Sequence, residues 1–121
     1  MLIVLNDELG TLTVNKLMEE YETSNNQTNR VTPSYYVVDL SNLFMVQQFV
    51  KDMPYDRCDY LINAAASIMC ENGLTELNKT NMEKQFCINY LSHYLLTTLL
   101  ARTIIKCSGR VINFASNDQL S

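Results

Sequence analysis

The sequence predicts an α/β fold, in which helices flank a parallel sheet. Short apolar or β-branched segments alternate along the chain with longer segments whose apolar residues recur at helical spacing. Strand, helix, strand in repeated order is typical of parallel sheets whose connections run through helices. The chain has 121 residues, 47% of them hydrophobic, which is enough for one domain with a packed core and no more than one. We therefore expect residues 1–121 to belong to a single domain.

The first half of the chain predicts two strands and two helices. Residues 2–5 form a short apolar run, as in a buried parallel strand, and residues 11–21 have helical spacing. The polar residues 23–29 predict a surface loop, and the β-branched and aromatic residues 35–38 predict the second strand. Ser41 is expected to cap the next helix. The inward face of that helix is predicted to comprise Leu43, Phe44, Val46, Phe49 and Val50.

The second half predicts two more strands around a long helix. Residues 60–62 form the third strand and residues 111–114 the last. Between them, helical spacing extends from about residue 81 to residue 106, and Gly109 follows as a stop signal. The apolar positions that define this helix are Met82, Phe86, Leu91, Leu95, Leu99 and Ile104.

Composition excludes several classes of function. The formal net charge of −4 argues against a nucleic-acid-binding surface, which needs clustered Lys and Arg. No apolar run is long enough to span a bilayer, and the first residues become acidic too soon for a secretory signal. The four cysteines are widely spaced and the chain has one His, so we expect free thiols and no metal site.

Two motifs in the second half resemble the short-chain dehydrogenase/reductase family. Residues 83–97 read EKQFCINYLSHYLLT, and residues 109–116 read GRVINFAS. The first motif is similar to the branch that contains retinol dehydrogenases, the WW-domain oxidoreductase and protochlorophyllide reductase. It shares with that branch Glu83, Gln85, Phe86, Asn89, His93 and Tyr94. The resemblance implies a Rossmann-type parallel sheet with flanking helices, here incomplete.

The resemblance also implies two catalytic residues. Asn89 matches the Asn that supports a proton relay, and Ser116 matches the Ser that orients a substrate oxygen. The alternatives are a solvent-facing Asn89 and a Ser116 that only caps the next segment. His93 is expected to pack. The Tyr and Lys that complete the family's catalytic set are absent, because no segment supplies Tyr-x-x-x-Lys in the right place.

Further matches follow the second and third predicted strands, where an open parallel sheet binds ligands. Asp39 and Leu40 match an Asp-Leu pair that contacts the adenine of the cofactor; the alternative is that Asp39 helps to cap a helix. Residues 63–66, Asn-Ala-Ala-Ala, resemble the Asn-Asn-Ala-Gly turn that faces the cofactor ribose. Asn63 matches either the first or the second Asn of that turn, and Ala64 and Ala65 follow it. The alternative is an ordinary strand end whose small residues pack against a helix.

The family's glycine-rich phosphate turn is also absent, since the chain has only three glycines and no G-x-x-x-G-x-G. We therefore expect residues 2–5 to be the family's second strand, which places Asp7 where the family selects its cofactor. A carboxylate there favours NAD over NADP. The rival placement makes residues 2–5 the first strand and Gly10 a remnant of the glycine turn.

The preferred placement predicts two separate parallel pairs, residues 2–5 with 35–39 and residues 59–63 with 111–115, because the family's central strand is missing. We expect a segment of an oxidoreductase that uses NAD or NADP and a small alcohol or carbonyl substrate, inactive as the isolated chain. The alternative is a truncated, non-catalytic member that acts through protein contacts. A homo-oligomer is compatible with the sequence, and the expected location is the cytoplasm or the cytosolic face of a membrane.

Overall fold

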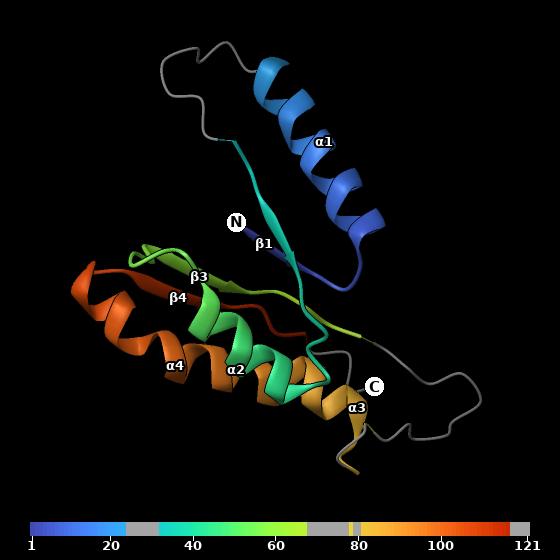
Figure 1. Ribbon diagram of the computed structural model, residues 1–121, viewed down its shortest axis with the longest axis vertical. Helices are drawn as coiled ribbons and strands as arrows, with labels where there is room; N and C mark the ends of the chain where they lie inside the picture. The colour runs from blue at the N-terminus through green and yellow to red at the C-terminus, as the bar shows by residue number, and fades with distance from the viewer. Residues whose placement is uncertain (24–31, 68–77, 79–80, 117–121) are drawn as a thin grey trace. The chain divides into compact units, whose positions relative to one another are not determined.

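The computed structural model describes residues 1–23, 32–67, 78 and 81–116 (Figure 1). The chain divides into two compact units, residues 1–39 and residues 40–121. The single-domain expectation stays a prediction. The predicted loop at residues 23–29 lies outside the described residues from residue 24 onward.

The first unit consists of two parallel strands and a helix. Strand β1 (Leu2–Val4) pairs with β2 (Tyr35–Val37), with Leu2 opposite Tyr35 and Val4 opposite Val37. Helix α1 (Asp7–Thr23) connects them and begins four residues earlier than the spacing predicts. Its start is fixed by Asn6, whose side-chain Oδ1 accepts a hydrogen bond from the Leu9 N–H at 2.9 Å. Asn is a favourable capping residue, because it satisfies an amide that has no partner within the helix.

The second unit pairs strand β3 (Tyr60–Asn63) in parallel with β4 (Arg110–Asn113). The helices of this unit are α2 (Leu43–Asp52), α3 (Lys84–Phe86) and α4 (Ser92–Lys106), and the π-helical segment η1 (Cys87–Leu91) joins α3 to α4. Helix α4 packs against both α2 and β3 (Figure 1). The buried apolar side chains of this packing are Val46, Phe49, Cys87, Leu96, Leu100 and Ile104.

The sheet arrangement confirms the prediction of two separate parallel pairs. The described strands form two two-stranded sheets, β1 with β2 and β3 with β4. The rival placement required β1 beside β3, a pairing that is not found among the described strands. Gly10 is also not part of a glycine turn. It lies inside α1, where a Cβ would collide with the ring of Tyr35, so its role is close packing of the helix on β2.

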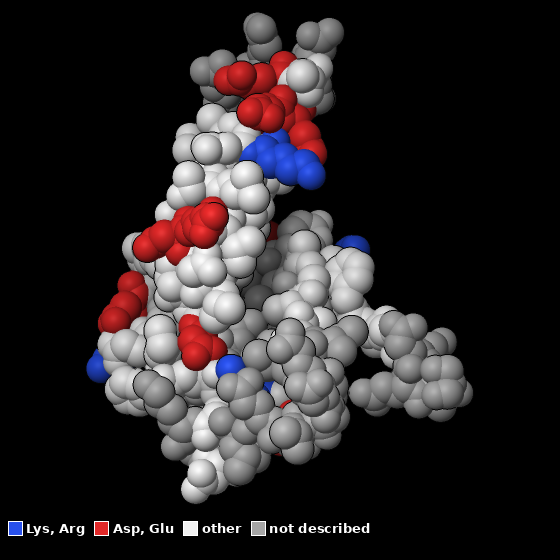
Figure 2. Space-filling view, turned by 90° about the vertical axis from the view of Figure 1, so that its right-hand side faces the viewer, with Lys and Arg blue, Asp and Glu red and all other residues white. Residues whose placement is uncertain are grey.

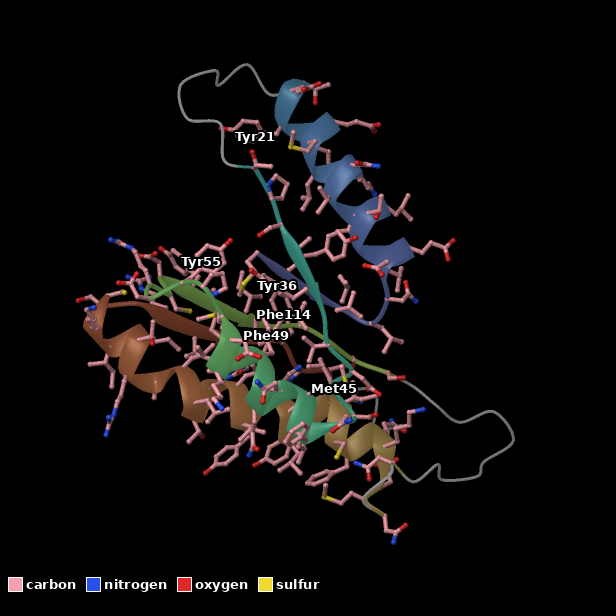
Figure 3. The ribbon with its side chains drawn as sticks, viewed as in Figure 1. Tyr21, Tyr36, Met45, Phe49, Tyr55 and Phe114 are labelled. Carbon is pink, nitrogen blue, oxygen red and sulfur yellow. The ribbon has the colours of Figure 1, made fainter. Side chains whose placement is uncertain are left out.

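Two predictions about helix α2 are wrong. Its N-cap is Asn42, not Ser41: the Asn42 Oδ1 accepts hydrogen bonds from the backbone N–H groups of Phe44 and Met45. Ser41 is instead buried. Phe44 is not on the inward face, since 71% of it is exposed. The buried positions are Val46 and Phe49, and Phe49 lies one turn beyond Met45 along the helix (Figure 3).

The long helix begins at Lys84, and its buried positions agree only in part with the predicted ones, among which Ile104 is buried. Phe86 and Leu99 are exposed, whereas Cys87, Leu96 and Leu100 are buried. The π-helical segment η1 affects only the positions after it, because a π-helical turn holds one more residue than an α-helical turn. A regular 3.6-residue period fitted through residues 81–106 therefore places Leu99 wrongly, whereas the exposed Phe86 precedes η1.

The predicted stop at Gly109 needs a refinement. The residue in the left-handed conformation is Ser108, with φ of 52°. The N–H groups of Ser108 and Gly109 bond the carbonyls of Ile105 and Ile104, which is the Schellman arrangement. Gly109 is required for a second reason, because a Cβ there would collide with the backbone carbonyl oxygens of Cys58 and Asp59. The close approach allows the Arg110 N–H to bond the Asp59 carbonyl at 2.8 Å and start β4.

Candidate active site

Asn89 lies in the π-helical segment of the long helix. In η1 the Ser92 N–H bonds the carbonyl of Cys87, five residues back. The Ser92 hydroxyl, also buried, donates to the carbonyl of Ile88 at 2.9 Å. Such segments interrupt the regular helical ladder and occur frequently at functional sites. The sequence pattern identified Asn89 as a candidate but gave no sign of the π-helical geometry around it.

The side chain of Asn89 hydrogen-bonds the main chain of Ser67, in the segment that follows β3. Its Oδ1 accepts from the Ser67 N–H at 2.8 Å, and its Nδ2 donates to the Ser67 carbonyl at 3.1 Å. One carboxamide thus satisfies both main-chain groups of a residue that has no strand neighbour at this point. The alternative of a solvent-facing Asn89 is wrong. Ser67 was not among the sequence candidates, because only the fold shows that it faces the helix.

Asn63 forms hydrogen bonds at the beginning of the same segment, at the end of β3. It is 3% exposed, and its Nδ2 donates to Asn113 Oδ1 at 2.8 Å and to Thr97 Oγ1 at 3.2 Å. Both N–H groups of the Asn63 amide therefore have acceptors within the protein. The two hydrogen bonds connect β3 to β4 and to α4. Asn113 is the partner of Asn63 in the parallel register. Asn113 could have been identified from the sequence only by aligning the two predicted strands so that Asn63 lies opposite Asn113.

The three residues between Asn63 and Ser67 are exposed alanines, Ala64, Ala65 and Ala66. This disagrees with the alternative in which the small residues pack against a helix. Their methyl groups leave the backbone of the segment accessible at the carboxyl end of β3. Ala64 and Ala65 thus occupy the edge where a parallel sheet binds its ligands.

Ser116 lies three residues beyond the end of β4 and is exposed. Because β3 and β4 are parallel neighbours, Ser116 and the Ala64–Ser67 segment leave the same edge of the sheet. The fold therefore places the catalytic candidate Ser116 on the edge to which Asn89 is also tied through Ser67.

The candidates near the beginning of the chain lie on the other unit. Asp7 is the first residue of α1, and its Oδ1 accepts a hydrogen bond from the Tyr35 hydroxyl at 3.3 Å. The same hydroxyl lies 3.2 Å from Thr11 Oγ1. Asp7 and Asp39 follow the parallel neighbours β1 and β2, so both lie at the carboxyl edge of that pair. The sequence did not single out Tyr35, which holds the Asp7 carboxylate in place.

Leu40 begins the second unit and precedes the buried Ser41. The carbonyl of Ser41 accepts a hydrogen bond from Nδ2 of Asn78 at 2.8 Å. The chain that leaves β2 is therefore fixed by a residue far along the sequence. Leu40 is half-buried, so part of its side chain remains accessible.

His93 lies between Asn89 and Thr97, four residues from each, on one face of the helix. Asn89 hydrogen-bonds Ser67, and Thr97 accepts a hydrogen bond from Asn63. The Nε2 atom is buried and has no hydrogen-bond partner within the described part of the chain. Burial lowers the pKa of His93 below its usual value, because the charged form is less well solvated. The expected packing role of His93 stays a prediction.

The described residues contain no cluster of three metal-ligating side chains. Cys58, Cys87 and Cys107 are free thiols, and the fourth cysteine, Cys70, lies outside the described ranges. Within the same ranges, no helix has the length and apolarity that crossing a bilayer requires. Figure 2 shows one face of the molecule, on which acidic side chains outnumber basic ones, in line with the net charge of −4.

Known proteins resemble this chain over most of its length. A model of the short chain dehydrogenase family matches residues 8–120. Human retinol dehydrogenase 13 is 31% identical over 106 residues, which cover 82% of this chain and 31% of that protein. Mouse retinol dehydrogenase 13 is 35% identical over 82 residues, covering 65% of this chain and 24% of the mouse protein. The chain thus spans about a quarter to a third of these relatives.

A solved structure shows the same fold. A metagenomic short-chain oxidoreductase, crystallised in complex with NADP, superposes with a TM-score of 0.67 at 19% identity. The match covers 94% of this chain and 49% of the metagenomic enzyme. The Rossmann-type, incomplete α/β fold expected from the sequence is therefore confirmed. Together with the family match and the arrangement of Asn63, Asn89 and Ser116 around one sheet edge, this establishes that the chain belongs to the short-chain dehydrogenase family.

Proposed function

We propose that this chain supplies part of the cofactor and active site of a longer oxidoreductase, which transfers a hydride between NAD or NADP and an alcohol or carbonyl carbon. The observation that carries the proposal is the double hydrogen bond from Asn89 to Ser67. It ties the catalytic candidate on η1 to the segment that, by family resemblance, faces the cofactor. The π-helical turn around Asn89 supports the proposal, because such turns occur frequently at functional sites.

The residues present fit the ribose and adenine parts of such a cofactor. Ala64 and Ala65 expose backbone at the carboxyl end of β3 and offer no bulky side chain. Asp7 presents a carboxylate suited to ribose hydroxyls and would repel a 2′-phosphate, which favours NAD. Asp39 and Leu40 would contact the adenine. No glycine turn for the pyrophosphate is found in these 121 residues, so the fit is partial.

Two residues would act on the substrate side. The Ser116 hydroxyl would donate a hydrogen bond to the carbonyl oxygen of the substrate. Asn89 would support a proton relay from its place on η1. The nicotinamide ring, when bound, supplies or accepts the hydride. The proton donor and its neighbouring cation, a Tyr and a Lys in this family, would come from residues beyond these 121.

Retinol is the first substrate to test, since the relatives described above are named retinol dehydrogenase 13. Other alcohols or carbonyl compounds would fit the same chemistry. We place the protein in the cytoplasm or on the cytosolic face of a membrane, where thiols such as Cys58, Cys87 and Cys107 stay reduced.

A second candidate is a non-catalytic family member that acts through protein contacts. The sequence observation in its favour is the absence of both the glycine turn and Tyr-x-x-x-Lys. Under this reading Asn89 would keep its structural bonds to Ser67, while Ser116 would have no catalytic role.

A graft distinguishes the two candidates. This chain would replace the matching segment of human retinol dehydrogenase 13, and the oxidation of retinol would be measured with NAD and with NADP. The unmodified human protein is the reference, and circular dichroism checks that the graft is folded. Turnover that depends on the cofactor supports the proposal. A folded graft that binds neither cofactor and turns over no retinol would favour the non-catalytic candidate.

A further inference from the structure

The side chain of Asn78 forms hydrogen bonds with three other residues of the second unit, and none of the catalytic or cofactor-binding roles above depends on them. Its Nδ2 donates to the Ser41 carbonyl at 2.8 Å and lies 3.2 Å from Cys87 Sγ. Its Oδ1 accepts from the Met82 N–H at 3.0 Å. Its own N–H donates to the Met82 carbonyl at 2.8 Å. The carboxamide thus uses both its donor and its acceptor side within the protein.

The two acceptors of the Asn78 amide belong to elements that the site uses. Ser41 is buried and directly follows Leu40, at the exit of β2. Cys87 is fully buried and is the first residue of η1. Two residues later, Asn89 holds Ser67 at the exit of β3. The π-helical segment is therefore linked to Ser41 through Cys87 and Asn78, and to Ser67 through Asn89.

We propose that Asn78 is a positioning residue for the adenine side of the cofactor site. Its amide ties the main chain of Ser41, directly after Leu40, to η1, which also holds Ser67 through Asn89. The ligand concerned is an adenine nucleotide. The inference rests on the proposed function, because that proposal places adenine at Leu40.

The structure offers a substitution that separates positioning from local loop folding. In Asn78→Asp the carboxylate still accepts from the Met82 N–H, but it cannot donate to Ser41 or Cys87. It also places a negative charge opposite the Ser41 carbonyl oxygen. Asn81→Gly is the matched control in the same loop. Asn81 has φ of 60°, which glycine adopts readily, and its N–H bond to the Asn78 carbonyl is retained.

The test uses the 121-residue chain and adenosine monophosphate as the probe. Amide chemical shifts are followed by NMR during a titration into the millimolar range. The wild-type chain and Asn81→Gly should show shifts at Leu40 and Ser41. Asn78→Asp should lose them, and its Cys87 should be alkylated faster by iodoacetamide, while the rates at Cys58 and Cys107 stay unchanged.

Each contrary outcome is informative. If the wild-type chain shows no shift at Leu40, the assignment of adenine to this exit fails, and the inference fails with it. If the wild-type chain and Asn78→Asp show equal shifts, the inference alone is overturned and the proposed function stands. If Asn78→Asp accelerates alkylation equally at Cys58, Cys87 and Cys107, the substitution has destabilised the whole unit, and a specific positioning role is excluded.

Discussion

Asn89 and Ser67 lie 22 residues apart and are joined by two hydrogen bonds, from the carboxamide of the first to both main-chain groups of the second. This pair connects the π-helical segment to the exit of β3. It gives Asn89, a catalytic candidate, a structural role that can be measured without any substrate.

Asn89→Ala is expected to lower the free energy of unfolding by about 1–3 kcal/mol, because it leaves the Ser67 N–H and carbonyl without their partner. Urea denaturation of the chain measures this loss, and amide exchange at Ser67 should accelerate. Gln47→Ala, an exposed position on α2, is the control and should change stability by no more than about 0.5 kcal/mol. Equal stability of Asn89→Ala and wild type would contradict the assignment.

Gly109→Ala and Ser108→Gly should have opposite effects on stability. The first places a methyl group against the carbonyl oxygens of Cys58 and Asp59 and should cost about 1–3 kcal/mol. The second relieves a left-handed residue with a side chain and should stabilise the chain by up to about 1 kcal/mol. Thermal unfolding of the two variants measures the difference. A destabilised Ser108→Gly would argue against the left-handed conformation.

The stability of the chain should depend on pH through His93. Its pKa is lowered by burial, so the unfolded chain binds the proton more tightly than the folded chain does. Stability should therefore fall as the pH drops through the unfolded value near 6.5, and level off below the folded pKa. His93 is the only histidine, so His93→Gln should remove this part of the pH profile while leaving the acidic limb due to carboxylates. An unchanged profile in His93→Gln would refute the prediction.

Ser116→Ala in the graft should reduce turnover by roughly 10²-fold or more, as expected when a positioned hydrogen-bond donor is lost. Asn89→Ala should also reduce turnover, whereas His93→Ala should mainly reduce stability. Thr98→Ala, at an exposed position of α4, is the control. The site assignment is wrong if Ser116→Ala leaves turnover untouched while His93→Ala abolishes it in a folded protein.

The isolated chain should bind NADH and NADPH only very weakly. It has no glycine turn at a helix N-terminus to hold the pyrophosphate. Calorimetric titration with each nucleotide tests this expectation. Micromolar affinity for either would show that the site is more complete than the sequence indicates.

The sequence by itself determined the strand–helix alternation, the family and the separation of the strands into two pairs. Apolar runs such as Leu2–Val4 are local signals and were enough to identify β1, whereas its pairing with β2 was predicted from the family resemblance and the missing central strand. The resemblance of the motifs around Asn89 and Ser116 to the short-chain dehydrogenase/reductase family identified the candidate catalytic residues. These features depend on residue type and order, which the sequence states directly.

Tertiary structure decided which side chains support the site. The extra residue in η1 rotates α4, so Leu96 and Leu100 are buried, whereas Leu99, which the helical period favoured, is exposed. Asn63 is buried and hydrogen-bonds Asn113 within the protein. Asn78 is a candidate positioning residue only because the fold brings it to Ser41 and Cys87. Hydrogen bonds between residues far apart in the chain depend on how the elements pack, and no local pattern encodes them.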